Sequence, residues 1–353
     1  MKKFKLSMML ILMSMLVFSA CGGGGGGGSD DPDKPGDNPG DDPGDDPKDP
    51  TATLEIKGDT YTYTLPGGTE FNLMLTPVVA VTNTFPCNID GDDSYEEATD
   101  IANVPARFIM GETEVTYQLW KEVHDWAIAN GYTFANAGVK GNDGAAAKTA
   151  QHPVTTVNWR DTIVWCNALT EYYNTNNDDS ETDLVCVYTY NGSIIRDSSD
   201  ANATACDGAV QSTTAKGFRL PGSMEWEYAA RYRGTETTNA VAGSDGSYYT
   251  KGNSASGATA DYSDGSATSA VAVYGVSSTA IVKSKGSGAN ALGLYDMSGN
   301  VWEWCYDISG GSRRVFRGGA FNYNAYDMQV GKVHDSDPYN ERSYIGFRFC
   351  RSW

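Results

Sequence analysis

A chain of 353 residues is long enough for one large domain or for two, and it carries 26 Lys and Arg against 45 Asp and Glu. The formal charge of −19 would repel a phosphate backbone, which excludes a general nucleic-acid binder. With 40% hydrophobic and 11% aromatic residues the chain can bury a sizeable core, so wholesale disorder is also excluded.

The chain begins with a segment typical of a secretion signal. Basic residues within the first five positions precede an apolar stretch, residues 6–20, which is shorter than the roughly 20 residues needed to span a bilayer. The stretch ends in the letters VFSAC, which resemble the cleavage box of bacterial lipoproteins, with Phe18 where Leu is more usual. We predict that residues 1–20 are a signal peptide and that lipid on Cys21 anchors the protein at the bacterial outer membrane or cell surface. Ordinary cleavage, with Cys21 as an incidental thiol, is the alternative.

Residues 21–50 have the composition of a tether. Seven glycines follow Cys21, and residues 30–50 hold nine Asp and two Lys, a net charge of −7, together with six of the 13 prolines. Such a segment has nothing to bury, so we expect an extended, self-repelling linker. Residues 51–353 then form the folded part, which remains acidic at about −15 without the signal and the tether.

The folded part starts with strand patterns. Residues 52–56 and 61–65 alternate polar and apolar side chains. A Pro-Gly-Gly turn at 66–68 then leads into a third apolar run at 71–79. We therefore predict three strands at the start of the domain.

Helix patterns come next in the chain. Apolar side chains at spacings of three and four predict helices over 115–127 and 159–173. A third helix is predicted after the Leu-Pro pair at 220–221, where Gly222 or Ser223 can cap it. Beyond these, Gly- and Ser-rich loops separate short aromatic strands, so we predict a loop-rich α+β domain with few helices.

Six cysteines remain once Cys21 is set aside, an even number for an oxidising compartment. Fifteen complete pairings exist, and Cys186 and Cys206 bracket a polar loop, so we predict that these two pair locally. No CxxC pair occurs, so zinc ribbons and thioredoxin-like chemistry lack their spacing.

Residue patterns of common catalytic sites are scarce. The chain has three histidines, no HExxH motif and no GxSxG motif, which argues against a catalytic zinc and a serine triad. Glu225 and Glu227 are paired carboxylates, but residues two apart on a helix point in different directions. We predict that they form salt bridges to Arg219 or Arg231 rather than an acid–base pair.

A more specific signal is the order of five sequence blocks along the domain. They read GETEVTYQLW at 111–120, HPVTTVNW at 152–159, GFRLP at 217–221 with EWEYAAR at 225–231, GLYDMSGNVWEW at 293–304, and RGG at 317–319 with GFR at 346–348. This series resembles the formylglycine-generating enzyme, or sulfatase-modifying factor, family. The resemblance runs from about Leu54 to the C-terminus. It implies one domain, residues 51–353, with a variant of the C-type lectin fold.

The resemblance fails at the positions that carry catalysis in that family. Its enzymes oxidise a cysteine of a client sulfatase with copper held by two cysteines shortly after the RGG block. The matching positions here are Tyr323 and Met328, and Ala320 replaces the usual Ser. Because cuprous copper prefers thiolates, we expect neither copper nor catalytic turnover.

The resemblance also implies calcium. In the family, backbone carbonyls and one carboxylate of the NVWEW block hold the ion. The matching residues are Asp296, Gly299, Val301 and Glu303. A second family site, carried over more weakly, matches Asn253, Ser254 and Asp264. Oxygen ligands on a rigid loop suit calcium, and the alternative for Glu303 is a buried salt bridge.

The segment that replaces the copper site has the composition of a binding surface. Of the 24 residues from 321 to 344, 13 are Asn, Asp, His, Ser or Tyr. Tyr supplies rigid contact area, while the others supply adaptable hydrogen bonds. The frame of residues 317–348 is similar to the variable regions that diversity-generating retroelements rewrite on lectin-like scaffolds. The expected ligand-binding residues are Asn322, Tyr323, Asn324, Tyr326, Asp327, His334, Asp335, Asp337, Tyr339, Ser343 and Tyr344.

Taken together, these features predict a non-catalytic lipoprotein that binds an external protein or glycan and no nucleic acid. One alternative is an oxidase of the formylglycine-generating type with an altered active site. Another is a structural lipoprotein of an envelope or secretion assembly. In a third, the segment is a degenerate loop whose tyrosines only pack against the domain.

Overall fold

The computed structural model of the chain describes residues 53–77, 84–87, 100–104, 107–175 and 183–353. All of these belong to one compact unit, Lys48–Trp353. The predicted signal, Cys21 and almost all of the tether precede that unit and lie outside the described residues, so nothing in the structure tests them. Within the described part, no helix combines the length and the apolar character that a membrane crossing requires.

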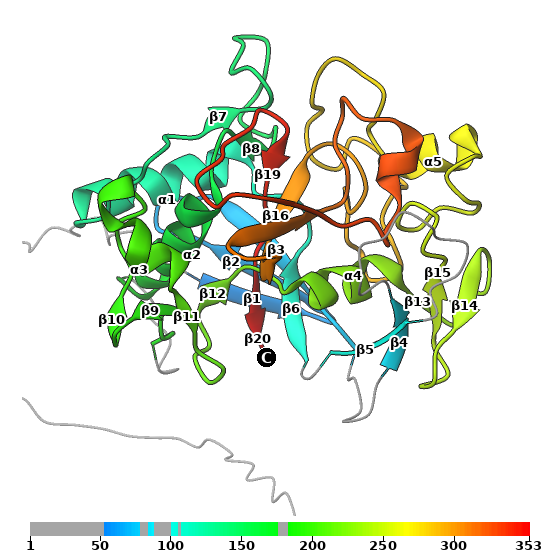
Figure 1. Ribbon diagram of the computed structural model, residues 1–353, viewed down its shortest axis with the longest axis horizontal. Coiled ribbons are helices and arrows are strands. Elements are labelled where there is room, and N and C mark those ends of the chain that lie inside the picture. The colour runs from blue at the N-terminus through cyan, green and yellow to red at the C-terminus, as the bar shows by residue number, and fades with distance from the viewer. Residues whose placement is uncertain (1–52, 78–83, 88–99, 105–106, 176–182) are drawn as a thin grey trace, which may run out of the picture. The chain divides into compact units, whose positions relative to one another are not determined.

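A six-stranded antiparallel sheet runs through the centre of the fold (Figure 1). Its strands, in spatial order, are β1 Thr53–Lys57, β2 Thr60–Thr64, β3 Glu70–Leu75, β6 Phe108–Gly111, β20 Cys350–Ser352 and β12 Phe218–Arg219. The alternation that predicted the first strands is clear in β2, where Tyr61 and Tyr63 are buried and the threonines are partly exposed. Because β20 pairs with both β6 and β12, the end of the chain is built into this sheet.

Two longer helices, α1 Tyr117–Ala129 and α2 Trp159–Thr175, lie to the left of the sheet in Figure 1. Helix α1 begins two residues later than predicted because Thr116 caps it, its Oγ1 accepting the Leu119 N–H at 3.2 Å. The two helices contact each other through Trp120 and Trp165, whose rings stack with centroids 5.9 Å apart.

Helix α2 begins where the sequence predicted, and a reciprocal cap explains why. The Asp161 N–H donates to Asn158 Oδ1 at 2.9 Å, and the Asn158 N–H donates to Asp161 Oδ2 at 3.0 Å. These two bonds satisfy backbone donors that a helix start would otherwise leave unpaired.

A second, four-stranded sheet is formed mainly by the C-terminal part of the chain. Its strands, in spatial order, are β18 His334–Ser336, β17 Arg313–Arg317, β16 Trp302–Ser309 and β19 Ile345–Gly346. Neighbouring strands are antiparallel except β16 and β19, which are parallel. The segment that the sequence singled out for binding thus alternates between strands of this sheet and the loops that connect them.

The remaining elements are short. The small sheets are β10 Ser193–Ile194, β9 Tyr188–Tyr190 and β11 Val210–Gln211; β13 Tyr232–Gly234, β15 Tyr248–Thr250 and β14 Ala240–Ala242; β4 Thr84–Cys87 with β5 Asp100–Asn103; and β7 Val139–Lys140 with β8 Val154–Thr155. The short helices are α3 Ala203–Asp207, α4 Ser223–Arg231 and α5 Gly265–Val271, with 3-10 turns η1 Asp200–Asn202 and η2 Ala325–Met328.

Helix α4 confirms the predicted role of the two neighbouring glutamates. Its start is held by Glu225, which accepts the Gly222 N–H at 2.8 Å and pairs with Arg219 at 2.7 Å. Glu227 pairs with Arg231 at 2.7 Å, and both side chains are fully buried. The carboxylates are therefore structural ion-pair partners rather than an acid–base pair.

The predicted disulfide between Cys186 and Cys206 is wrong. Neither forms a disulfide in the structure, nor do the other four cysteines of the described part, and all six are buried. The Cys186 thiol donates to the Asn167 carbonyl at 3.5 Å, whereas the Cys206 thiol donates to the Asp197 carbonyl at 3.1 Å. The loop between them is thus tied down by hydrogen bonds to different parts of the fold.

Candidate functional site

The C-terminal segment, residues 317–348, divides into a buried frame and an exposed set. All eleven residues predicted to bind a ligand are exposed or partly exposed. In contrast, residues 317–321, 328–332 and 345–348 are buried. The structure therefore presents the predicted residues to solvent and uses the stretches between them to fasten the segment to the domain.

Arg317 fastens the start of the segment. Its Nη2 lies 2.9 Å from Glu227 Oε2, and its Nε donates to Ser223 Oγ at 2.8 Å. Its Nη1 donates to the backbone carbonyl groups of Val330 and Lys332. One fully buried guanidinium group therefore connects β17, helix α4 and the far side of the segment's first loop.

The two glycines after Arg317 make the sharp turn that follows. Gly318 and Gly319 have φ angles of 100° and 80°, a region that L side chains rarely adopt. A Cβ atom on Gly319 would also lie 2.6 Å from the backbone oxygen of Asp327. The RGG block is needed here because only glycine permits this close return of the chain.

Arg348 fastens the end of the segment. Its Nε and Nη2 donate to Glu303 at 2.6 and 2.7 Å, and both side chains are fully buried. The same carboxylate accepts the indole N–H of Trp226 at 2.6 Å. The exposed residues of the segment thus lie between two buried arginines, Arg317 and Arg348, one at each end of the segment.

Three of the predicted residues gather around Trp302, a fully buried side chain of β16. The ring centroid of Tyr323 lies 5.6 Å from that of Trp302, and that of His334 lies 4.8 Å from it. Tyr344 packs against Tyr323 with centroids 5.6 Å apart. This aromatic group forms a rigid patch that remains partly open to solvent.

Burial, reinforced by the neighbouring Tyr344 hydroxyl, raises the pKa of Tyr323 to about 12. The phenol is therefore neutral at physiological pH and can donate a hydrogen bond to a ligand.

Two further predicted residues shape the loop at η2. Asn324 caps this turn, its Oδ1 accepting the Tyr326 N–H at 2.9 Å. The Tyr326 ring contacts Tyr262 at a centroid distance of 5.3 Å and the ammonium group of Lys332 at 3.7 Å. The loop is therefore held in one shape before any ligand arrives.

Asp335 of β18, together with Asp337 and Tyr339 after it, contacts neighbouring groups. Asp335 accepts a hydrogen bond from Ser309 Oγ at 2.8 Å and pairs with Arg313 at 2.6 Å. The Tyr339 hydroxyl donates to Asp337 at 3.2 Å, while its ring lies over the guanidinium group of Arg160, 5.7 Å away. Asn322 and Ser343 are exposed, and Asp327 is partly exposed.

Sequence reasoning missed three residues that support this surface: Trp302, Arg160 and Tyr262. Trp302 lies within the NVWEW block, so a family motif marked its position but not its contacts. Arg160 and Tyr262 carry no signal in the sequence, because each meets the segment only through the tertiary fold.

The two positions that hold copper-binding cysteines in the resembled family do not fit copper here. Met328 is fully buried in a small apolar cluster with Ala255, Ala258 and Ala272. Tyr323 packs against that cluster and holds a neutral phenol. A thioether and a neutral phenol cannot replace two thiolates around cuprous copper.

The residues matched to the first calcium site are engaged by protein groups. Glu303 holds Arg348 with both oxygens, which is the salt bridge that the sequence left open as an alternative. Asp296 accepts the Lys283 N–H at 2.7 Å, and burial raises its pKa to about 6. Gly299, with a φ of 84°, forms a β-bridge with Val273, and its N–H donates to the Gly318 carbonyl at 2.8 Å. Glu303 therefore does not fit a calcium ligand while Arg348 is in place.

The second set of calcium residues is also used locally. Asp264 caps helix α5, accepting the Ser266 and Ala267 N–H groups at 3.0 Å each. The Ser254 hydroxyl donates to Asn253 Oδ1 at 3.2 Å. Across the described residues, no group of three or more His, Cys, Asp and Glu is arranged to hold a metal ion. Calcium binding through backbone carbonyls stays a prediction.

Comparisons with known proteins agree with this architecture. A family model described as the sulfatase-modifying factor enzyme 1-like domain matches residues 64–353. The solved structure of Treponema denticola variable protein 1 is 28% identical, with a TM-score of 0.59, and the match covers 84% of this chain and 100% of that chain. The structure of CarF is 26% identical, with a TM-score of 0.53, and the match covers 78% of this chain and 99% of the CarF chain. The predicted α+β, C-type lectin-like fold and the resemblance to variable proteins are confirmed.

The curated relatives match over shorter stretches. Chaperone protein LppX of Paenibacillus barcinonensis is 27% identical over 215 residues, which cover 57% of this chain and 62% of that protein. Serine/threonine-protein kinase pkn1 of Chlamydia caviae is 35% identical over 82 residues, which cover 18% of this chain and 13% of that kinase. The chain thus spans less than two thirds of the length of these relatives.

Proposed function

The chain belongs to the family of sulfatase-modifying factor enzyme 1-like domains, and on that premise we propose that it binds an external protein or glycan instead of catalysing a reaction. The observation that carries the proposal is the division of residues 317–348. Every predicted contact residue reaches solvent, and the stretches between them are buried and held by Arg317 and Arg348. A rigid frame that presents Tyr, Asn, Asp and Ser side chains is the arrangement of a paratope.

The absence of turnover is part of the proposal. The positions that match the copper cysteines hold Tyr323 and Met328, and the six described thiols lie buried elsewhere. Incubation with copper and a peptide containing Cys-x-Pro-x-Arg tests this directly. We expect no aldehyde in the mass spectrum, and formation of one would identify an oxidase.

We further propose that the protein is displayed at a bacterial surface through lipid on Cys21 and the acidic tether, as the cleavage box and composition support. The similarity to a variable protein supports diversification of residues 317–348. The flanking DNA checks this part. A reverse transcriptase and a near-copy of these codons are expected, and absence of both would remove diversification while leaving binding intact.

A blocking experiment tests the binding function. The full chain is applied to arrays of purified extracellular proteins and glycans, beside the variant Asn322→Arg with Ser343→Arg. Both positions are exposed within the segment, so long cationic side chains there should obstruct the surface without disturbing the frame. We expect at least a tenfold loss of binding with an unchanged melting temperature.

The matched control is Thr213→Arg with Thr237→Arg, which adds the same charge at exposed positions outside the segment. This control should bind like the parent protein. Equal binding by the blocked variant and the parent would show that another surface binds the ligand, and would overturn the proposal.

A further inference from the structure

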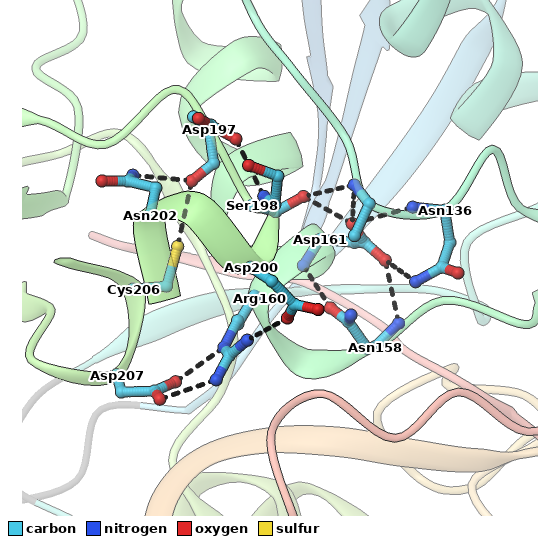
Figure 2. Close-up of polar contacts among 12 residues, drawn as sticks. Asn136, Asn158, Arg160, Asp161, Asp197, Ser198, Asp200, Asn202, Cys206 and Asp207 are labelled. Atoms are coloured by element: carbon cyan, nitrogen blue, oxygen red, sulfur yellow. Dashed lines mark hydrogen bonds and ion pairs between the residues drawn. The ribbon is translucent and has the colours of Figure 1, made fainter. Parts of the chain in front are cut away.

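Arg160 connects the start of helix α2 to a part of the chain outside the C-terminal segment. Its Nε and Nη2 donate to the two carboxylate oxygens of Asp207 at 2.8 and 2.7 Å. Its Nη1 donates to Asp200 at 3.0 Å, as Figure 2 shows. Since Asp200 opens η1 and Asp207 ends α3, one guanidinium group holds both ends of this short helical insert.

The neighbouring Asp161 makes the attachment rigid. It is fully buried and accepts hydrogen bonds from Ser198 Oγ at 2.6 Å and Asn136 Nδ2 at 2.8 Å (Figure 2). It also accepts the Asn158 N–H described above, so the insert and the loop before it are both tied to the start of α2. The position of Asp200 is therefore set by the scaffold.

Tyr339 of the C-terminal segment meets Arg160, the residue of α2 that holds this insert. Its ring lies over Arg160, yet 51% of the residue remains exposed. The Tyr339 hydroxyl donates to Asp337, so a carboxylate from the segment lies at the hydroxyl end of the ring. Asp200, held by the same Arg160, brings a second carboxylate from the insert.

Near this ring, acidic side chains lie mostly at the surface, whereas most cationic side chains are buried. The side chain of Asp200 is 94% exposed, whereas that of Arg160 is 5% exposed. Within the segment, Arg317, Lys332 and Arg348 are buried and Arg342 is exposed, whereas all four acidic residues, Asp327, Asp335, Asp337 and Glu341, reach solvent. Acidic groups therefore outnumber cationic groups at the surface of the segment, which favours a cationic ligand.

We propose that Tyr339, Asp337 and Asp200 form a recognition rim for an arginine or lysine side chain on the surface of a protein partner. A guanidinium group can pack on the exposed part of the tyrosine ring and hydrogen-bond to the flanking carboxylates. The inference rests on the proposed binding function and adds that one anchor, Asp200, lies outside residues 317–348.

The test uses the full chain and two labelled twelve-residue peptides, one alternating Arg and Gly and the other alternating Glu and Gly. Fluorescence anisotropy at 50 and 300 mM NaCl measures their affinities. We expect the arginine peptide to bind and the glutamate peptide not to bind. The double variant Asp200→Asn with Asp337→Asn should weaken binding of the arginine peptide at least fivefold.

The control for the overall negative charge is Asp59→Asn with Asp183→Asn, which removes the same charge at exposed positions on other elements. It should change the affinity less than twofold. An equal loss in both double variants would mean that the peptide only senses the net charge of the domain, and would overturn the inference.

Two substitutions at Tyr339 separate stacking from simple apolar contact. Tyr339→Phe keeps the aromatic face and should retain at least half of the affinity, whereas Tyr339→Leu should lower it at least threefold. Equal affinities of these two variants would contradict a stacked cation. Unchanged melting temperatures exclude unfolding as the cause.

The inference and the proposed function fail in different ways. No binding of the arginine peptide at 50 mM NaCl overturns the cationic rim. If the variant Asn322→Arg with Ser343→Arg still loses binding to the ligand found on the array, the proposed binding function stands. That ligand is then recognised by contacts other than a cationic side chain on this rim.

Discussion

Arg348 and Glu303 form a fully buried ion pair between the last block of the segment and strand β16, through two hydrogen bonds of 2.6 and 2.7 Å. The pair joins the frame of the proposed binding surface to the centre of the domain. It also occupies the carboxylate that the family resemblance assigned to calcium. Both facts can be tested.

Replacing Arg348 with Met should leave the Glu303 carboxylate buried without its cation. We expect the free energy of unfolding to fall by about 3–5 kcal/mol, the usual cost of breaking a buried pair from one side. Urea unfolding measures it. The control Arg342→Met alters an exposed arginine and should change stability by less than about 0.5 kcal/mol. Similar decreases in the free energy of unfolding of both variants would show that the Arg348–Glu303 pair contributes no more to stability than an exposed arginine does.

Calcium removal tests the family-derived prediction against this geometry. Because Arg348 holds Glu303, we expect a chelator to leave the melting temperature of the full chain unchanged. Thermal unfolding with and without excess EDTA is the measurement. A decrease that added calcium reverses, but added magnesium does not, would show that backbone oxygens of the NVWEW block hold calcium.

Alkaline pH should destabilise the protein through its buried tyrosines. Burial raises the pKa of Tyr323 and of Tyr172 to about 12, compared with about 10 in an unfolded chain. The folded state therefore keeps protons that the unfolded state loses, so stability is fully present below pH 10 and falls as the pH rises toward 12. Urea unfolding at pH 8, 10 and 11.5 measures this.

Tyr323→Phe is the matched variant for that titration because it removes one of the shifted hydroxyl groups. The free energy of unfolding of this variant should decrease less between pH 10 and 11.5 than that of the parent protein. Identical decreases would mean that Tyr323 ionises equally in both states.

Thiol titration tests the correction of the predicted disulfide. Burial raises the pKa of Cys186 and of Cys206 to about 12, so both thiols should be unreactive in the folded protein at pH 8. In denaturant without reductant, all six cysteines of the described part should react with a thiol reagent. Only four reactive thiols would show that one disulfide, such as Cys186–Cys206, forms after all.

Several elements could be predicted because their causes are local. The start of α2 follows from Asn158 and Asp161, which are three residues apart and cap each other. The inward tyrosines of β2 follow from strict alternation. The exposure of the eleven predicted contact residues also agreed with composition, since polar side chains between buried blocks tend to face water.

Other features could not be predicted because they depend on residues that are distant in sequence. The partner of Glu303 is 45 positions away, and a motif can mark this carboxylate without showing whether calcium or Arg348 will occupy it. The prediction of a Cys186–Cys206 disulfide was wrong for a similar reason. Two cysteines at the ends of a loop need not lie close together in the fold, and here each thiol donates a hydrogen bond to a different backbone carbonyl group.

The sequence by itself determined the family and the fold class, and it marked the segment that we propose for binding, because ordered blocks, periodicity and residue type are properties of the chain. Only the tertiary structure decided which buried arginines hold that segment, and that the Tyr339 ring lies over Arg160, which also holds Asp200. The physical reason is that ion pairs and ring contacts depend on where packing brings distant strands and helices together. No local pattern of residues encodes that position.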